Sequence, residues 1–284
     1  MLTAREPTIL VRPGLLRVRS LLTARQPKLA APPWRWAALG ALVGLCLTLL
    51  IYPPASWLAV LVSRATSGQL QLTEVRGTVW TGSARLQLSG GTGSRDSAVL
   101  PGEVNWKLRP GWLALKLGIS ADCCTPTPLQ ARLTPRWGGG MLQWSDGTSQ
   151  WPAIVLAGLG TPWNTVQAEG ILQLATKDFS VQWVEGRLVV AGLAELTALG
   201  MSSRLSTLKP MGSYRLALTG GSVPTLNLST LDGSLQLTGQ GQWTGARLRF
   251  EGVATASPDN EAALSNLLNI VGRRTGTRSI ITLG

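Results

Sequence analysis

Residues 84–88 read Ala-Arg-Leu-Gln-Leu, so apolar and polar side chains alternate at five successive positions. Because successive side chains of an extended chain point to opposite sides, this alternation predicts a strand with one buried face and one hydrated face. The same alternation recurs in segments 113–119, 129–133, 179–183, 214–218 and 246–250. Gly, Pro, Asn and Ser separate these segments at short intervals, as is typical of connections between strands. The sequence therefore predicts a mainly β domain with an antiparallel sheet.

Two tryptophans share a local sequence context within this β-rich part. Segment 77–86, Gly-Thr-Val-Trp-Thr-Gly-Ser-Ala-Arg-Leu, resembles segment 241–248, Gly-Gln-Trp-Thr-Gly-Ala-Arg-Leu. We interpret each copy as a Trp that covers the end of the sheet, followed by a Thr-Gly turn in which Gly supplies positive φ. This structural role is favoured over stacking on a ligand. The residues expected to shape the turns are Gly77, Trp80, Gly82, Trp243 and Gly245.

Between the two copies, residues 134–165 are rich in Gly, Pro and Trp. Pro152 and the run Gly138-Gly139-Gly140 are incompatible with a continuous helix, so the seven-residue spacing of three tryptophans is not a coiled-coil heptad. We expect this segment to connect two β subdomains, residues 63–137 and 165–284. A Trp-rich partner surface is the alternative interpretation.

Two short helices are also predicted. Leucines at positions 193, 196 and 199 hint at one that ends at Gly200. The other, a short C-terminal helix, begins near Ser257 as N-cap with Pro258 at N1 and acidic residues in the first turn. Its apolar residues follow at helical spacing and are Leu264, Leu267, Leu268 and Val271. We expect this stripe to cover an open end of the sheet rather than to dock a partner.

An uncharged apolar run, residues 36–52 (WAALGALVGLCLTLLIY), precedes the β-rich part. As a helix it extends about 26 Å, close to the thickness of a bilayer core. We therefore predict a single transmembrane anchor with an interfacial segment over residues 36–62. A cleaved signal peptide is the competing interpretation, but the preceding basic region is too long for a typical signal. The residues expected at the membrane interface are Trp34, Arg35, Trp36, Tyr52 and Trp57.

The formal net charge is +12, and half of this excess lies in the first 35 residues. Because Lys and Arg accumulate on the cytoplasmic side of membrane spans, residues 1–35 are predicted to be a basic cytoplasmic leader. Residues 63–284 then form a periplasmic β-rich domain. Attraction of the leader to anionic lipid headgroups explains its charge. The remaining basic residues are dispersed and are not interleaved with stacking aromatic residues, so nucleic acid is not an expected partner.

The composition argues against an enzyme. The chain contains no His, which excludes Ser-His-Asp and Cys-His nucleophiles and His-ligated metals. No spacing pairs two carboxylates, and the Gly-rich segments lack the context of a nucleotide-binding loop. Cys123 and Cys124 are adjacent, and they are either a strained ring, a link to another chain, or free thiols. We expect no catalytic residue, metal, cofactor or small-molecule substrate.

The order of several motifs resembles that of a known family. The motifs are Pro-Ala-Ser-Trp-Leu at 54–58, Gly-Thr-Val-Trp-Thr-Gly at 77–82, Val-Asn-Trp-Lys-Leu-Arg-Pro at 104–110 and Leu-Ser-Asn-Leu-Leu-Asn-Ile-Val-Gly at 264–272. Over residues 36–284 this order is similar to that of protein N of the type II secretion (general secretion pathway) machinery. Trp106, in the third motif, joins the expected structural residues. The 35-residue leader is longer than the short cytoplasmic tail expected from the family.

The resemblance implies a non-enzymatic inner-membrane component of the machine that moves folded proteins from the periplasm across the outer membrane. Its implied role is scaffolding, with other inner-membrane secretion components and the phospholipid bilayer as partners. The alternative function is a membrane-anchored periplasmic trough for lipid transfer, as in lipopolysaccharide-bridge and AsmA-like proteins. A trough requires an apolar concave face, whereas Arg85, Arg132 and Arg249 make at least one face of the strands polar. The opposite face of the strands is compatible with a lipid-transfer trough.

Overall fold

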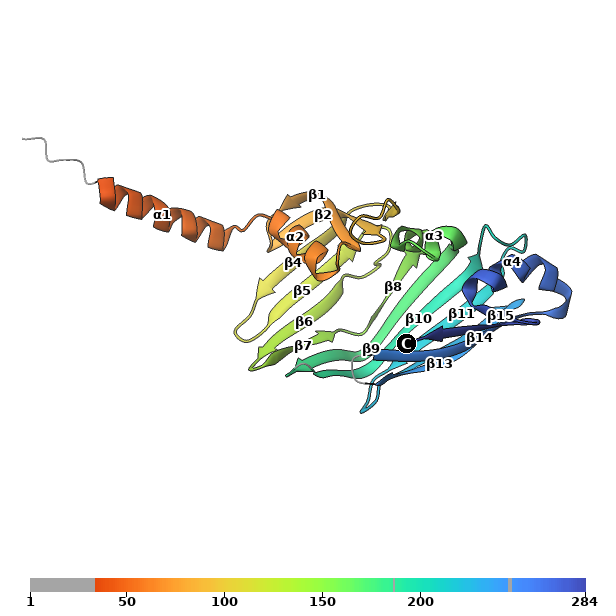
Figure 1. The fold of residues 1–284 in the computed structure, drawn as a ribbon. Helices are drawn as coiled ribbons and strands as arrows, with labels where there is room; N and C mark the ends of the chain where they lie inside the picture. Colours follow the sequence, from red (N-terminus) through yellow and green to blue (C-terminus); the bar gives the residue numbers. More distant parts are fainter. Residues whose placement is uncertain (1–33, 186, 245–246) are drawn as a thin grey trace, which may run out of the picture. The chain divides into compact units, whose positions relative to one another are not determined.

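The computed structural model describes residues 34–185, 187–244 and 247–284. The chain divides into two compact units, Met1–Cys46 and Leu47–Gly284. The first unit contains, among the described residues, most of helix α1 (Trp34–Ile51). The second contains the last turn of α1 and the β-rich part (Figure 1). The predicted basic leader, apart from residues 34 and 35, lies outside the described residues.

Helix α1 is apolar and long enough to cross a bilayer. Its 18 residues extend about 27 Å, and none of its side chains is buried by protein. Trp34, Arg35 and Trp36 form its first turn, Tyr52 follows its last residue, and Trp57 lies in the next helix. The apolar run therefore forms the predicted helix. Its length and composition fit a membrane anchor and a signal sequence alike.

The second unit is built on one antiparallel sheet. In the described part of the chain its strands hydrogen-bond in the order β1-β2-β4-β5-β6-β7-β9-β10-β11-β12-β13-β14-β16-β15, with β3 beside β2 and β8 beside β9. The strands are β1 (Leu70–Gly77), β2 (Thr81–Ser89), β3 (Ser97–Val99), β4 (Val104–Pro110), β5 (Leu115–Ala121), β6 (Leu129–Arg136), β7 (Gly139–Trp144), β8 (Gly147–Pro152), β9 (Glu169–Val184), β10 (Arg187–Ser202), β11 (Gly212–Thr219), β12 (Thr225–Gly233), β13 (Leu235–Thr244), β14 (Arg247–Ala256), β15 (Arg273–Thr275) and β16 (Arg278–Leu283). The six segments predicted from alternation coincide with or overlap β2, β5, β6, β9, β11 and β14, which confirms the mainly antiparallel β fold.

Alternation along the strands gives the sheet one apolar face and one polar face. In β4, Val104 and Trp106 are buried, whereas Lys107 and Arg109 are exposed. Short helices lie on the apolar face, most of them near one end of the strands (Figure 1). They are α2 (Ser56–Ala65), the 3-10 helix η1 (Ala153–Leu159), α3 (Trp163–Val166), the 3-10 helix η2 (Pro258–Asn260) and α4 (Glu261–Val271).

The largest hydrophobic cluster lies beneath α4. Leu264, Leu267 and Leu268 are at most 2% exposed and pack against strand residues that include Tyr214 and Leu235. Burial of each leucine contributes about 1.5–3 kcal/mol, which is why this apolar stripe fixes the helix to the sheet. The predicted C-terminal helix is confirmed. It is preceded by the 3-10 turn η2, so the α-helix itself begins after the predicted N-cap.

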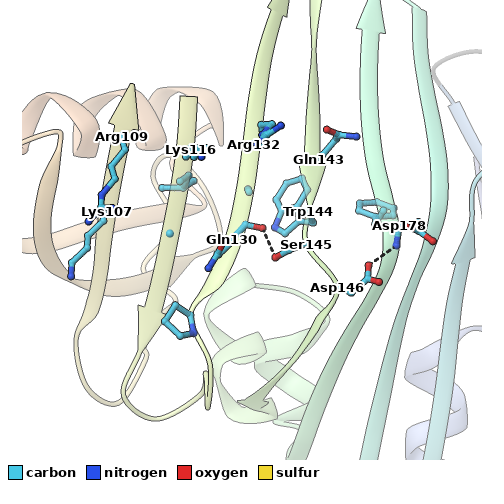
Figure 2. Close-up of a pocket in the computed structure, with 15 residues that line it drawn as sticks. Lys107, Arg109, Lys116, Gln130, Arg132, Gln143, Trp144, Ser145, Asp146 and Asp178 are labelled. Atoms are coloured by element: carbon cyan, nitrogen blue, oxygen red, sulfur yellow. Dashed lines mark hydrogen bonds between the residues drawn. The ribbon is translucent and has the colours of Figure 1, made fainter. Parts of the chain in front are cut away.

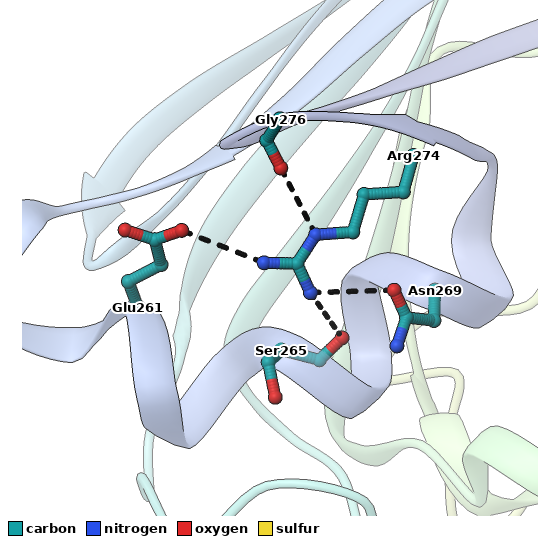
Figure 3. Close-up of polar contacts among 5 residues, drawn as sticks. All are labelled: Glu261, Ser265, Asn269, Arg274 and Gly276. Atoms are coloured by element: carbon teal, nitrogen blue, oxygen red, sulfur yellow. Dashed lines mark hydrogen bonds and ion pairs between the residues drawn. The ribbon is translucent and has the colours of Figure 1, made fainter.

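Arg274, on β15, joins α4 to the strand that follows it (Figure 3). Its Nε donates to the carbonyl oxygen of Gly276 at 3.0 Å, and its Nη2 lies 3.4 Å from the Glu261 carboxylate. Its Nη1 donates to the Ser265 carbonyl oxygen and to Asn269 Oδ1. One guanidinium therefore satisfies acceptors on α4 and in the β15–β16 turn, and the planar donor fork of Arg is suited to this role.

Two predictions about secondary structure are wrong. Residues 193–199 belong to strand β10 instead of a helix, because hydrogen bonding to β9 on one side and β11 on the other overrides the local leucine spacing. Residues 134–165 are mostly regular structure rather than a connection. They contain β7, β8, η1 and most of α3, and the hydrogen-bonded sheet runs through them from β6 to β9.

The predicted Trp-Thr-Gly turn also differs from the structure. In the first copy the turn precedes Thr81, and Thr81 and Gly82 already belong to β2. In the second copy Trp243 lies within β13, and Gly245 is outside the described residues. The two copies are thus not equivalent in structure. Gly77 has positive φ, at +88°, whereas Gly82 has an ordinary φ and is needed for a different reason.

Gly82 provides space for the buried Trp106. A Cβ at position 82 would lie 2.5 Å from Trp106 Cζ2 and 2.5 Å from the Arg76 carbonyl oxygen. Gly82→Ala should therefore lower the free energy of unfolding by about 1–3 kcal/mol through overpacking. Denaturant unfolding of the full chain in detergent, followed by Trp fluorescence, measures this change. Gly147→Ala is the matched control, because a Cβ there meets nothing within 4 Å. Equal stability of the two variants would contradict the assignment.

Candidate functional site

Four basic side chains gather on the polar face of three adjacent strands. Lys107 and Arg109 lie on β4, Lys116 on β5 and Arg132 on β6, and all four are exposed. Each alternates with an apolar residue, so strand geometry directs all four to the same face. Figure 2 shows them side by side with Gln143 of β7. They line an open groove of about 1000 Å³, which we call the basic groove.

The strand register places three of these cations directly opposite one another. Arg109 is the Cα partner of Lys116, and Lys116 is the Cα partner of Arg132. Directly opposed side chains in a sheet have Cβ atoms about 4.5–5.5 Å apart, and like charges there are destabilising. None of the five salt bridges formed by the described residues involves the basic groove. The row therefore forms no ion pair with a carboxylate, although Asp146 and Asp178 also line the groove.

Other arginines on the same sheet are neutralised by neighbouring strands. Arg85 lies 3.0 Å from the Glu74 carboxylate, and Arg215 lies 3.1 Å from that of Glu195. The fold can thus place a carboxylate beside a strand arginine. The uncompensated row in the basic groove is consequently a local feature and not a general property of this sheet.

The far side of the basic groove is held together by hydrogen bonds. Asp146 Oδ1 accepts from the Asp178 backbone N–H at 2.7 Å, and Ser145 Oγ donates to the Gln130 carbonyl oxygen at 3.0 Å (Figure 2). Asp146 is therefore engaged in supporting the backbone. The rings of Trp144 and Phe179 pack beside these contacts, with centroids 6.1 Å apart.

The groove offers charge and hydrogen-bond donors, which suits binding of an anionic surface. Arginine guanidinium groups bind carboxylates through two parallel hydrogen bonds, and lysine ammonium groups act as point charges. Within the described residues there is no group of three or more His, Cys, Asp or Glu placed to hold a metal ion. Cys123 and Cys124 form a disulfide with each other, the first of the three arrangements considered.

Tyr214 is the titratable group that the fold perturbs most clearly. It belongs to the hydrophobic cluster beneath α4, and its buried hydroxyl has no hydrogen-bond partner among the described residues. Burial, followed by the nearby Asp232 carboxylate, raises the pKa of this hydroxyl well above its usual range. Tyr214 therefore stays neutral at physiological pH and is a core residue rather than an acid or base.

Several residues singled out from the sequence meet at the β1–β2 turn. Trp80 Nε1 donates to the Ile51 carbonyl oxygen at 3.0 Å, so the turn is joined to the last residue of α1. Trp106 is 4% exposed, and its Nε1 donates to the carbonyl oxygens of Thr78 and Val79 at 3.2 and 3.1 Å. The four expected residues that the structure brings together are Gly77, Trp80, Gly82 and Trp106. Trp243 lies on β13, apart from them.

The basic groove was not singled out from the sequence. The alternation of Lys107 and Arg109 with apolar residues was visible in the motif at 104–110, and Arg132 was already assigned to a polar face. What the sequence alone lacks is the register that places these side chains opposite Lys116. A search for basic residues at alternating positions in successive predicted strands would have found the cluster.

Taken together, the described residues form one antiparallel sheet with an open basic groove, preceded by an apolar helix of membrane-spanning length. The family model for type II secretion system (T2SS) protein N matches residues 68–281. The chain therefore belongs to the T2SS protein N family and is a component of type II secretion. No curated protein and no solved structure matches the chain significantly.

Relief of charge repulsion gives a prediction for the isolated protein. Lys116→Gln removes the central charge of the row, so the free energy of unfolding should rise by about 0.2–1 kcal/mol. Denaturant unfolding at low ionic strength measures this gain, and added salt should reduce it because salt screens exposed charges. Arg95→Gln, in the exposed β2–β3 loop, is the control and should leave stability unchanged. A loss of stability in Lys116→Gln would show that the row is not repulsive.

Proposed function

We propose that this protein is a non-enzymatic inner-membrane scaffold of the type II secretion machinery, and that the basic groove docks an acidic surface of another secretion component. The observation that carries the proposal is the row of opposed cations without an ion-pair partner in a chain of the T2SS protein N family. Helix α1 supplies the anchor, and the sheet supplies the docking face. Folding gains nothing from this row, because like charges on neighbouring strands repel each other.

An acidic protein partner explains why such a row is tolerated. Bringing carboxylates into the groove turns a repulsive set of charges into an attractive one, and complementary charge also speeds and orients encounter between partners. Such docking weakens as salt increases, because the groove is exposed and open to counter-ions. The groove's length, across four adjacent strands, suits an extended or helical acidic segment better than a small anion.

The proposal is tested by neutralising the row in the full chain. The variant Arg109→Gln/Lys116→Gln/Arg132→Gln should fold and insert normally, leave secreted substrates folded in the periplasm, and reduce their appearance outside the cell several-fold. Crosslinks from the groove to inner-membrane secretion components should be lost in parallel. A matched control removes the same charge elsewhere, through Arg95→Gln/Arg204→Gln/Arg278→Gln. Equal secretion by both triple variants would overturn the docking role of the groove.

The inner-membrane orientation requires a separate measurement. A reporter that is active only in the periplasm should work when fused after Gly284 and fail when fused within residues 1–30. The physical reason is the excess of Lys and Arg before the apolar run, which retains that side in the cytoplasm. Determination of the mature N-terminus provides the control. A mature chain that begins near Thr66 would show signal cleavage and remove the anchor.

Lipid transfer is a second candidate function, favoured by a row of apolar residues on the opposite face. Cα pairing places apolar side chains opposite one another across five strands without interruption, and they are Leu115, Leu133, Leu142, Val181 and Val190. The first four are only half-buried, and none of them belongs to the hydrophobic clusters beneath the helices. Such a row resembles the surface on which an acyl chain would lie.

The two functions make different predictions for the apolar row. In a lipid conduit, Leu115→Asn or Leu142→Asn should lower the amount of lipid that copurifies with the full chain, whereas Leu231→Asn, an exposed control on β12, should not. In a scaffold, these variants should leave secretion intact as long as unfolding curves show a folded sheet. The conduit would be favoured over the scaffold by two results together. The Leu115→Asn and Leu142→Asn variants would lose copurified lipid, and the triple variant of the basic groove would secrete normally.

A further inference from the structure

Three turns of the sheet lie at the same end of the strands. Because β2 pairs with β4 and β5 pairs with β6, the turns β1–β2, β4–β5 and β6–β7 all fall at one end of their antiparallel strands. We call this row of turns at the strand ends the tip edge, which is not an edge strand of the sheet. It is defined by residues 78–80, 111–114 and 137–138. In Figure 1 the β4–β5 and β6–β7 turns lie beside each other, away from the short helices that cover the other end of the strands.

The tip edge exposes large apolar side chains at the apex of its turns. Trp112 is 98% exposed, Trp137 is 103% exposed, and Leu113 is 73% exposed. Backbone contacts fix these positions: the Gly111 N–H donates to the Ala114 carbonyl oxygen at 2.8 Å, and Gly138 has a φ of +77°. The two indoles therefore project fully into the surroundings of the protein. Isolated apolar side chains on a surface are ordinary, but two complete indoles on neighbouring turns are a feature of contact sites.

The end of helix α1 is fixed to this same edge. The Val79 N–H donates to the Pro53 carbonyl oxygen at 2.9 Å, beside the hydrogen bond from Trp80 to Ile51. These residues all belong to the second compact unit, so the last turn of α1 and the tip edge are parts of one body. Neighbouring strands lie about 4.8 Å apart, so the Trp137 turn is on the order of 20 Å from the β1–β2 turn along the edge.

Basic side chains flank the exposed indoles. Arg136 directly precedes Trp137, and Arg187 begins β10 at the next turn along the edge; both are exposed. Trp beside Arg is the combination that favours the boundary between lipid headgroups and water, because the indole enters the boundary while the guanidinium binds phosphate. Trp and Arg are also enriched where proteins bind each other, so a protein contact at these turns is the alternative that the lipid-quenching test below separates from a lipid contact.

We propose that the tip edge rests on the phospholipid surface of the membrane that α1 spans, with Trp112 and Trp137 inserted at headgroup depth and Arg136 on anionic headgroups. This inference rests on the membrane anchoring in the proposed function. The contact adds the β4–β5 and β6–β7 turns to the points at which the second compact unit meets the membrane. The basic groove lies on a strand face instead of the edge, and it stays accessible to a protein in this arrangement.

Site-directed fluorescence in nanodiscs tests the contact. The full chain with Cys46→Ser is reconstituted in nanodiscs of phosphatidylcholine and phosphatidylglycerol, and a polarity-sensitive fluorophore is attached at Trp112→Cys or Trp137→Cys. The matched control is Arg95→Cys, in the β2–β3 loop at the opposite end of the strands. Lipids that carry a quencher near the headgroup should reduce emission at positions 112 and 137 several-fold more than at position 95. Equal quenching at the three positions would overturn the proposal.

A second measurement tests whether Arg136 binds the charge of the headgroup. Arg136→Gln should weaken quenching at position 137 in nanodiscs that contain phosphatidylglycerol and have no effect in phosphatidylcholine alone. Indifference to this change in both membranes would contradict the headgroup contact. If α1 does not anchor the chain, the protein will not copurify with the nanodisc. That result distinguishes a failure of the proposed anchoring from a failure of the lipid contact. Failure of groove docking alone would leave all quenching results unchanged.

Discussion

The structure depends on uninterrupted pairing between neighbouring antiparallel strands. Each interior strand satisfies its backbone donors and acceptors through the strands on either side, so removal of one would expose two rows of unpaired groups. Short connections between most neighbouring strands keep this pairing local in sequence. The ladder also fixes which side chains share a face, since Cα partners lie on the same side. Both the apolar row and the basic groove are therefore consequences of one register.

The β1–β2 turn links this ladder to the helix that precedes it. Trp106 fills the space above Gly82 and binds the turn through its indole N–H, while Trp80 binds the end of α1. A side chain at position 82 would displace the indole and disturb both contacts. The local sequence of this turn thus holds Ile51, the last residue of α1, against the sheet, which is why small residues and tryptophans are concentrated there.

Local patterns were sufficient to predict several of the elements, but not which strands pair with each other. Strict alternation identified strands such as β2 and β6, and caps with an apolar stripe identified α4, because these signals depend on neighbours a few residues away. The leucine spacing in β10 suggested a helix, since only pairing with β9 and β11 decides its conformation. Local patterns do not predict the basic groove for the same reason. Its row exists only once the register places Lys116 between Arg109 and Arg132.

Two parts of the sheet differ in whether they carry features that folding does not require. On β10 and β11 the fold balances charge, as Arg215 and Glu195 show, and it buries the leucines of α4. On β4 to β7 it leaves three cations opposed and two indoles exposed. Neither feature stabilises the isolated chain, because like charges repel and exposed indoles gain nothing from water. The first lies on a face and the second on an edge, so an acidic protein and a lipid surface can occupy them at the same time. That separation is what the proposed scaffold requires, because its docking face must remain accessible while the strand ends contact lipid.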